Sequence, residues 1–130
     1  MKTIGAVESL TGGLFASVMT QKARSSKFFR GALVLYASDL KTQFGINIKN
    51  GTINGDVARQ MALIGKKILN VDICVAFTGN AGPQASDNKP VGEVWIALNE
   101  QVYKLLLAGS RTQIRQQCVD FALKKLQNLQ

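Results

Sequence analysis

The residues that could do chemistry gather in three short polar segments, each placed directly after an apolar run. The first covers 8–13 (Glu-Ser-Leu-Thr-Gly-Gly), the second covers 36–41 (Tyr-Ala-Ser-Asp-Leu-Lys), and the third covers 78–83 (Thr-Gly-Asn-Ala-Gly-Pro). Ligands of open α/β sheets bind at the carboxyl ends of the strands. We therefore expect the functional site among these three segments.

Ser9 is the candidate nucleophile. It lies where a predicted strand turns into a predicted helix. The residues that follow, Thr11, Gly12 and Gly13, offer backbone N–H groups at the helix N-terminus, which could stabilise an oxyanion or a phosphate. The same turn is also typical of an ordinary helix N-cap, so this pattern alone does not separate the two interpretations.

The sequence contains no histidine, and this limits the possible base. It excludes Ser-His-Asp and Cys-His centres and any zinc or iron site with imidazole ligands. A lysine can act as the base if burial or a neighbouring cation makes it neutral near pH 7. Lys41 is the candidate, and Glu8 and Tyr36 are the alternatives. On spacing alone, Lys41 fits a surface lysine equally well, and Tyr36 fits an aromatic residue at the end of a strand.

The basic residues outnumber the acidic ones by 16 to 8, which gives a net charge of +8. They are scattered, and no run of them is longer than two. Such a distribution is typical of a solvated basic surface, although a phosphate-bearing substrate or a polyanionic partner is also compatible with it. No pattern of a nucleic-acid-binding motif accompanies the charge, so a nucleic-acid partner is not expected.

Cys74 and Cys118 both lie in apolar stretches. This favours buried thiols in a reducing compartment over a disulfide or a metal pair. No apolar run approaches the ~18–20 residues that span a bilayer, and the first residues lack the apolar core of a signal peptide. We therefore expect a cytoplasmic protein without a membrane partner.

Turn-forming residues and the periodicity of the apolar residues predict the helices and strands that must position the three segments. Strands are expected at 3–7, 31–37, 71–77, 91–98 and 102–108, and helices from 14 onward and over 40–44, 54–69 and 111–126.

Local signals add detail to these elements. The continuous apolar run 31–37 predicts a strand covered on both faces. Ser38 or Asp39 could cap the short helix after it, and Asn54 could cap the long helix. Strands 91–98 and 102–108 are close enough in sequence to form an antiparallel hairpin.

The element order and the length predict the fold class. Crossover connections surround one hairpin, and 130 residues suit one domain. We predict a single domain over 1–130, an α/β fold with a three-layer α/β/α sandwich. Its mixed, mainly parallel sheet would contain one antiparallel hairpin.

Four segments together resemble a known family. They are 6–14, 31–41, 78–83 and 89–92, and they occur in order over nearly the whole chain. The set resembles the CinA family, in particular its C-terminal domain, the bacterial nicotinamide mononucleotide deamidase. The resemblance implies an amidohydrolase that converts nicotinamide mononucleotide to nicotinate mononucleotide and ammonia.

The resemblance also implies roles for individual residues. By position, the nucleophilic serine is Ser9, the catalytic lysine is Lys41, and the tyrosine between them is Tyr36. The residues implied in substrate binding are Thr11, Gly12, Gly13, Thr78, Gly79, Asn80, Gly82 and Arg111. Arg111 is a plausible contact for the phosphate and a cation that would lower the pKa of Lys41. No cofactor and no metal are implied, and a homo-oligomer, dimer or higher, is expected.

The sequence departs from the family pattern at several places, none of which includes Ser9, Tyr36 or Lys41. The family's Gly-Ile-Ala-Gly-Pro has Asn80 in second place, and its Gly-Asp-Arg has Ser110 before the arginine. The segment 51–55 also differs, and the family's helix before the first strand is not present. The alternative hypothesis is therefore a non-catalytic CinA-like module that binds a nucleotide or has a regulatory role.

Overall fold

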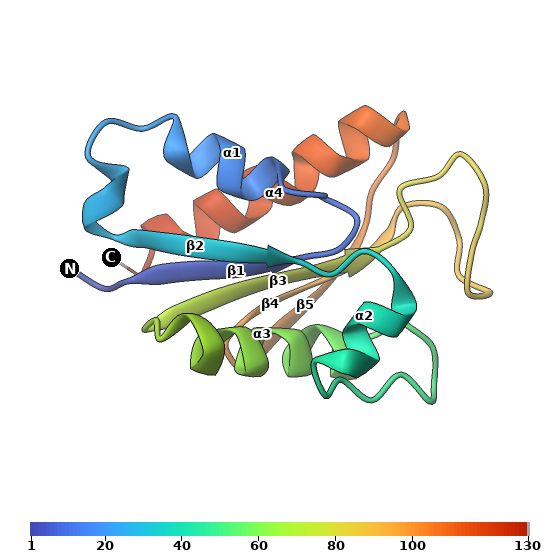
Figure 1. Ribbon diagram of the computed structural model, residues 1–130. Coiled ribbons are helices and arrows are strands. Elements are labelled where there is room, and N and C mark those ends of the chain that lie inside the picture. The colour runs from blue at the N-terminus through green and yellow to red at the C-terminus, as the bar shows by residue number, and fades with distance from the viewer. Residues whose placement is uncertain (130) are drawn as a thin grey trace.

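Five strands form the middle layer of the computed structural model, which describes residues 1–129 (Figure 1). They are β1 (Ile4–Glu8), β2 (Phe29–Val34), β3 (Ile73–Gly79), β4 (Glu93–Leu98) and β5 (Gln101–Leu106). Their order in the sheet is β2-β1-β3-β4-β5. β1 pairs parallel with β2 and β3, whereas β4 runs antiparallel to β3 and β5. The predicted mixed, mainly parallel sheet with the β4–β5 hairpin is therefore confirmed.

Helices cover both faces of the sheet, so the three-layer α/β/α arrangement is also confirmed (Figure 1). One face carries α1 (Leu14–Thr20) and α4 (Arg111–Gln127), and the other carries α2 (Ser38–Gln43) and α3 (Gly55–Leu69). A short 3₁₀ turn, η1 (Ser25–Lys27), precedes β2.

Each face has its own apolar core, because side chains alternate along a strand. In β1, Ala6 belongs to the cluster with Phe15 of α1, and Val7 belongs to the cluster with Met61 of α3. The cysteines follow the same division: Cys118 packs in the first cluster and Cys74 in the second. Both thiols are free and buried, as predicted. Burial raises the pKa of each to about 12.

Two local predictions were wrong. The strand expected at 31–37 is the edge strand β2, which is partly exposed and ends at Val34. An apolar run does not reveal whether a strand has one neighbour or two, and here β1 pairs with β3 on its other side. The second error concerns α2, which begins at Ser38 after Ala37 and has no side-chain cap.

Each of the two long helices has a side-chain cap, and the cap predicted at Asn54 is confirmed. Asn54 precedes α3 and its side chain accepts a hydrogen bond from the N–H of Val57 at 2.9 Å. Ser110 precedes α4 in a reciprocal capping box with Gln113. No helix within residues 1–129 combines the length and the apolar character needed to cross a membrane.

Candidate active site

The three polar segments meet at the carboxyl ends of β1, β2 and β3, the right-hand edge of the sheet in Figure 1. They enclose a pocket of about 220 Å³. Its wall includes the predicted site residues Ser9, Tyr36, Lys41, Thr78, Gly79, Asn80 and Arg111. Parallel strands bring their carboxyl ends to one edge, and this is how residues more than 100 positions apart share one pocket.

Lys41 and Ser9 form the centre of this pocket. The Nζ atom of Lys41 lies 3.0 Å from Oγ of Ser9. It also lies 2.9 Å from the carbonyl oxygen of Leu35 and 3.3 Å from that of Tyr36. Three residues separate the short helix α2 from the end of β2, so Lys41 in the last turn of α2 reaches back to the carbonyl groups at the strand end. The structure thus brings together the serine and the lysine that the sequence analysis singled out.

The surroundings of Lys41 disfavour an ammonium ion. Its residue surface is only 2% exposed, and burial lowers the pKa of its amine from the ordinary value. Within residues 1–129, the ion pairs are Arg59–Asp56 and Lys89–Glu93, and neither involves Lys41. Lys41 is therefore not the surface lysine that its spacing alone would also have fitted.

The carboxylate of Glu8 occupies the start of α1. It accepts hydrogen bonds from the N–H groups of Gly13 (3.2 Å), Phe15 (3.0 Å) and Ala16 (3.1 Å). The N–H of Gly12 donates to the carbonyl of Ser9 at 3.0 Å. The N–H groups that were expected to face an anion at Gly12 and Gly13 are therefore used within the turn. Glu8 is likewise engaged and is a poor alternative base.

Tyr36 and Arg111 contact each other at the mouth of the pocket. Nη2 of Arg111 donates to Oη of Tyr36 at 2.9 Å, and Nη1 of Arg111 donates to the carbonyl of Gly82. Tyr36 is 58% exposed, and it reaches Lys41 through its carbonyl oxygen. The pKa of Lys41 is lowered by burial, and the contribution expected from the charge of Arg111 is not seen.

The third segment is held by side-chain hydrogen bonds to residues outside it and by one bond within it. Oγ1 of Thr78 donates to the carbonyl of Thr52 at 2.6 Å. The side-chain amide of Asn80 donates to the carbonyl of Lys89 at 3.1 Å and accepts from the N–H of Gly82 at 3.1 Å. Asn80 therefore shapes the pocket wall by closing its own loop. Trp95, the only tryptophan in the sequence, lies opposite Thr78 in the β3–β4 register.

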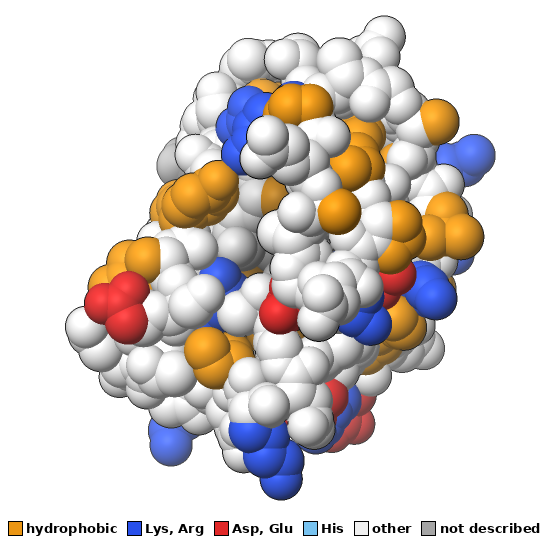
Figure 2. All heavy atoms as spheres, turned by 90° about the vertical axis from the view of Figure 1, so that its right-hand side faces the viewer, with side chains coloured by type: hydrophobic (Ala, Val, Ile, Leu, Met, Phe, Trp, Pro, Cys, Tyr) orange, Lys and Arg blue, Asp and Glu red, His pale blue; other side chains and the backbone are white. Residues whose placement is uncertain are grey.

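A second hollow of about 470 Å³ adjoins the pocket. Tyr36, Asn80 and Arg111 line both, and Gly82 lines only the outer one. Figure 2 shows the face of the molecule that carries these loops. Hydrophobic and basic side chains are scattered over it and do not form one continuous patch. This face therefore offers no continuous basic surface for a polyanion.

Some residues of the pocket were not predicted from the sequence as site residues. Thr52 and Ser86 line it, and so does Ser38, which was expected only as a helix cap. Asp87 accepts hydrogen bonds from the N–H groups of Thr52 (2.7 Å) and Ile53 (3.2 Å), which ties the loop before β4 to the loop before α3. Thr52 and Asp87 are 35 positions apart, and no spacing rule links such a pair.

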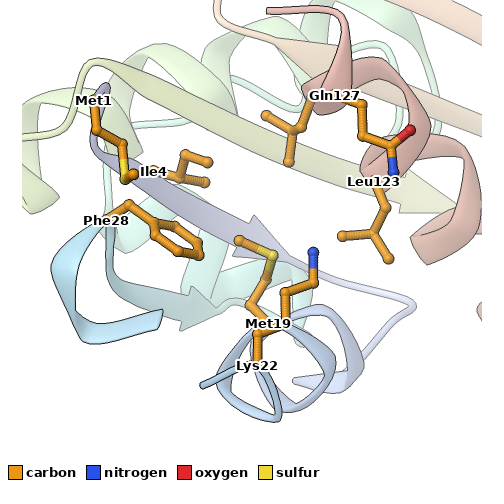
Figure 3. A pocket seen from close by; sticks show the side chains of 8 residues that line it. Met1, Ile4, Met19, Lys22, Phe28, Leu123 and Gln127 are labelled. Carbon is orange, nitrogen blue, oxygen red and sulfur yellow. The ribbon is translucent and has the colours of Figure 1, made fainter. Parts of the chain in front are cut away.

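Another cavity, of about 290 Å³, lies between α1, α4 and the amino end of β1 (Figure 3). Met1, Ile4, Met19 and Phe28 give it an apolar lining, and Lys22 is its one charged residue. It contains no nucleophile beside a base. The candidate active site is therefore the pocket at the carboxyl edge of the sheet.

Comparisons with known proteins give the family. A family model described as the CinA C-terminal domain matches residues 1–130. The chain belongs to the CinA C-terminal domain family. The resemblance found in the sequence motifs is thereby confirmed.

Relatives in this family differ in length. The Mycoplasma pneumoniae "Protein MG115 homolog" is 39% identical over 138 residues, which cover 98% of this chain and 87% of that protein. A competence-damage inducible protein of Bacillus mycoides is 37% identical over 141 residues, which cover 98% of this chain. The chain spans only 34% of the length of the Bacillus protein.

The crystal structure of the competence/damage inducible protein CihA from Agrobacterium tumefaciens has the same fold. Its TM-score is 0.90 at 33% sequence identity, and the match covers 98% of this chain and 85% of that chain. The names of the Bacillus and Agrobacterium proteins describe induction by competence or damage, and none of the three names states a reaction.

Proposed function

We propose that this CinA domain hydrolyses a primary carboxamide, converting nicotinamide mononucleotide to nicotinate mononucleotide and ammonia. The observation that carries the proposal is the buried amine of Lys41, 3.0 Å from Oγ of Ser9 and without a carboxylate partner among residues 1–129. A serine needs a base to become a nucleophile, and a lysine with a lowered pKa can be that base.

The hydrogen bonds of Lys41 fit this role. A neutral amine has two N–H groups and one lone pair. The carbonyl oxygens of Leu35 and Tyr36 can accept from the two N–H groups, which leaves the lone pair for the hydroxyl of Ser9. After proton transfer, the ammonium ion has three donors for the same three oxygens. The arrangement therefore serves both protonation states of the lysine.

The reaction then follows two steps. Oγ of Ser9 bonds to the amide carbon while its proton passes to Nζ of Lys41. The tetrahedral intermediate collapses, the C–N bond breaks, and ammonia leaves with the proton that Lys41 returns. In the second step Lys41 takes a proton from water, which attacks the acyl ester. The ester C–O bond breaks, nicotinate mononucleotide is released, and Ser9 regains its proton.

The outer part of the pocket fits the rest of such a substrate. Arg111 lies where the pocket joins the outer hollow, and a guanidinium is a strong partner for phosphate. Its Nη groups contact Tyr36 and Gly82, so a phosphate would share or replace these contacts. We propose that the nicotinamide group lies in the inner pocket and that the phosphate lies near Arg111.

The test is ammonia release from nicotinamide mononucleotide by the purified chain, with Ser9→Ala as the decisive variant. We expect Ser9→Ala to lose activity by a factor of at least about 10³, as nucleophile removal does in serine hydrolases. Ser17→Ala, at an exposed position of α1, is the matched control and should keep full activity.

Two results would contradict the proposal. One is an active Ser9→Ala protein that folds normally, because the nucleophile would then be another group. The other is a wild type that binds the mononucleotide but releases no ammonia, which would favour the non-catalytic module instead.

A further inference from the structure

Arg115, in the second turn of α4, holds the turn that carries Ser9. Its Nε atom donates to the carbonyl of Leu10 at 3.0 Å, and its Nη2 atom donates to the carbonyl of Thr11 at 2.8 Å. One planar guanidinium thus binds two successive carbonyls from more than 100 positions away. Neither the sequence motifs nor the proposed mechanism gave Arg115 a role.

The contact with Leu10 fixes the direction of one N–H group. In a trans peptide the C=O and the N–H point in opposite directions. The C=O of Leu10 points to Arg115 on α4, so the N–H of Thr11 in the same peptide points away from α4. The opposite side of the sheet carries α2, from which Lys41 reaches Ser9 (Figure 1).

This N–H group is buried, since Thr11 is 0% exposed, and no acceptor among residues 1–129 takes it. Within residues 1–129, the N–H groups of Leu10 and Thr11 donate to no protein acceptor, whereas the N–H groups of Gly12 and Gly13 do. Leu10 lines the pocket beside Ser9. Backbone N–H groups next to the nucleophile are the usual donors to the oxyanion of a tetrahedral intermediate.

We propose that Arg115 is a positioning residue that holds the Leu10–Thr11 peptide so that the N–H of Thr11 stabilises the oxyanion formed on Ser9. A charge-assisted hydrogen bond to the C=O also polarises the peptide and makes its N–H a stronger donor. The inference rests on the proposed amide hydrolysis, and it places the oxyanion donors at Leu10 and Thr11 and not at Gly12 and Gly13.

The test compares Arg115→Met with Arg115→Lys, and uses Arg59→Met on the exposed side of α3 as the control. Loss of an oxyanion donor lowers turnover by about 10²–10³-fold. We expect Arg115→Met to show this loss in kcat with less than about a threefold change in KM, because the substrate amide makes this contact fully only in the transition state. Arg115→Lys should recover part of the activity, because an ammonium can still bind one carbonyl.

A second readout separates positioning from a purely structural role. The aldehyde analogue of nicotinamide mononucleotide forms a tetrahedral adduct with the serine. In Arg115→Met its affinity should fall by the same factor as kcat/KM, while the affinity for nicotinate mononucleotide stays within about threefold. Equal loss for both ligands, or an unchanged kcat, would overturn the inference. If Arg115→Met does not fold, the same comparison is made with Arg115→Lys.

A third readout does not depend on the amide substrate. A fluorophosphonate reacts when Oγ of Ser9 displaces fluoride from phosphorus and Lys41 takes the serine proton. A wild type that is labelled but releases no ammonia would contradict the proposed function alone. Equal labelling rates of wild type and Arg115→Met would contradict the role of Arg115, because the phosphoryl oxygen uses the same donors.

Discussion

The amine of Lys41 is buried, where an ammonium ion is poorly solvated. The burial therefore lowers the stability of the fold at neutral pH. Unfolding returns the amine to water and restores its ordinary proton affinity. Because the folded pKa is lowered, the unfolded chain binds more protons in the window between the folded pKa and 10.5. The free energy of unfolding therefore rises with pH across that window.

Lys41→Met should remove this effect. Replacing a buried ion pair by apolar side chains of similar volume is often neutral or stabilises a fold by about 1–4 kcal/mol, and we expect an effect of this order for the single amine of Lys41. We expect a higher free energy of unfolding at pH 7 in urea titrations, a flatter dependence on pH below 10.5, and no ammonia release. Lys104→Met, on the partly exposed strand β5, is the control for loss of one positive charge. A lower stability of Lys41→Met would show that the ammonium is well accommodated.

The sequence was enough to predict which residue types form the candidate site, but it did not predict their exact contacts. Without histidine, Lys41 was the strongest candidate base for Ser9, and the structure brings the two within 3.0 Å. The sequence did not reveal that the N–H groups of Gly12 and Gly13 are used within the turn, by the carbonyl of Ser9 and the carboxylate of Glu8. The contact of Arg115 with this turn joins two distant segments, and no local pattern contains that information.

At the scale of elements, the loop between β3 and β4 forms one wall of the pocket. Hydrogen bonds attach the tip of this loop to a neighbouring loop. Asp87 accepts two backbone hydrogen bonds from the loop before α3, and the amide of Asn80 closes the base of the same loop. Gly51 approaches Asp87 so closely that a Cβ there would lie 2.4 Å from its Oδ2 atom. The wall is thus built from two loops that support each other.

Asp87→Ala should loosen this wall without touching the reacting groups. Two hydrogen bonds are worth about 1–3 kcal/mol in total. We therefore expect KM for the mononucleotide to rise about tenfold, with kcat within about threefold of the wild type. Steady-state kinetics of ammonia release measures both constants. Asp120→Ala, at an exposed position of α4, should change neither. A fall in kcat at constant KM would mean that the loop acts in the chemical step.

The errors at this scale concern the run 31–37 and the helix that follows it. The run 31–37 is apolar because part of it packs against other strands and helices, but pairing on one side only leaves Val34 44% exposed. Its last residues were assigned to the strand, although the chain turns there to begin α2. The cap at Asn54 was predicted correctly because a cap depends on neighbours within three residues, which a sequence shows directly.

At the scale of the whole molecule, α3 lies unusually close to the sheet. A Cβ on Gly65 would lie 2.3 Å from Cγ2 of Val7 and 2.6 Å from Sγ of Cys74. Both atoms belong to central strands that do not yield easily. This close approach fixes the distance between α3 and the sheet.

Gly65→Ala should therefore lower stability even though alanine is the better helix former. Helix propensity favours alanine by about 1 kcal/mol, whereas overpacking of a core costs about 1–3 kcal/mol or more. We expect a melting temperature several degrees lower than that of the wild type, measured by circular dichroism. Lys67→Ala, on the exposed side of the same helix, should stay close to the wild type. A more stable Gly65→Ala would mean that α3 can move outward freely.

Trp95 lies beside the wall of the candidate active site, so its fluorescence can report on ligand binding there. Its indole Nε1–H donates to the carboxylate of Glu93 at 2.9 Å, and its strand neighbour across the β3–β4 pair is Thr78 of the pocket wall. Because no second tryptophan contributes to the emission, a change in fluorescence on adding a ligand comes from this one place. Binding can then be followed with the unlabelled chain, including variants such as Ser9→Ala in which no product forms.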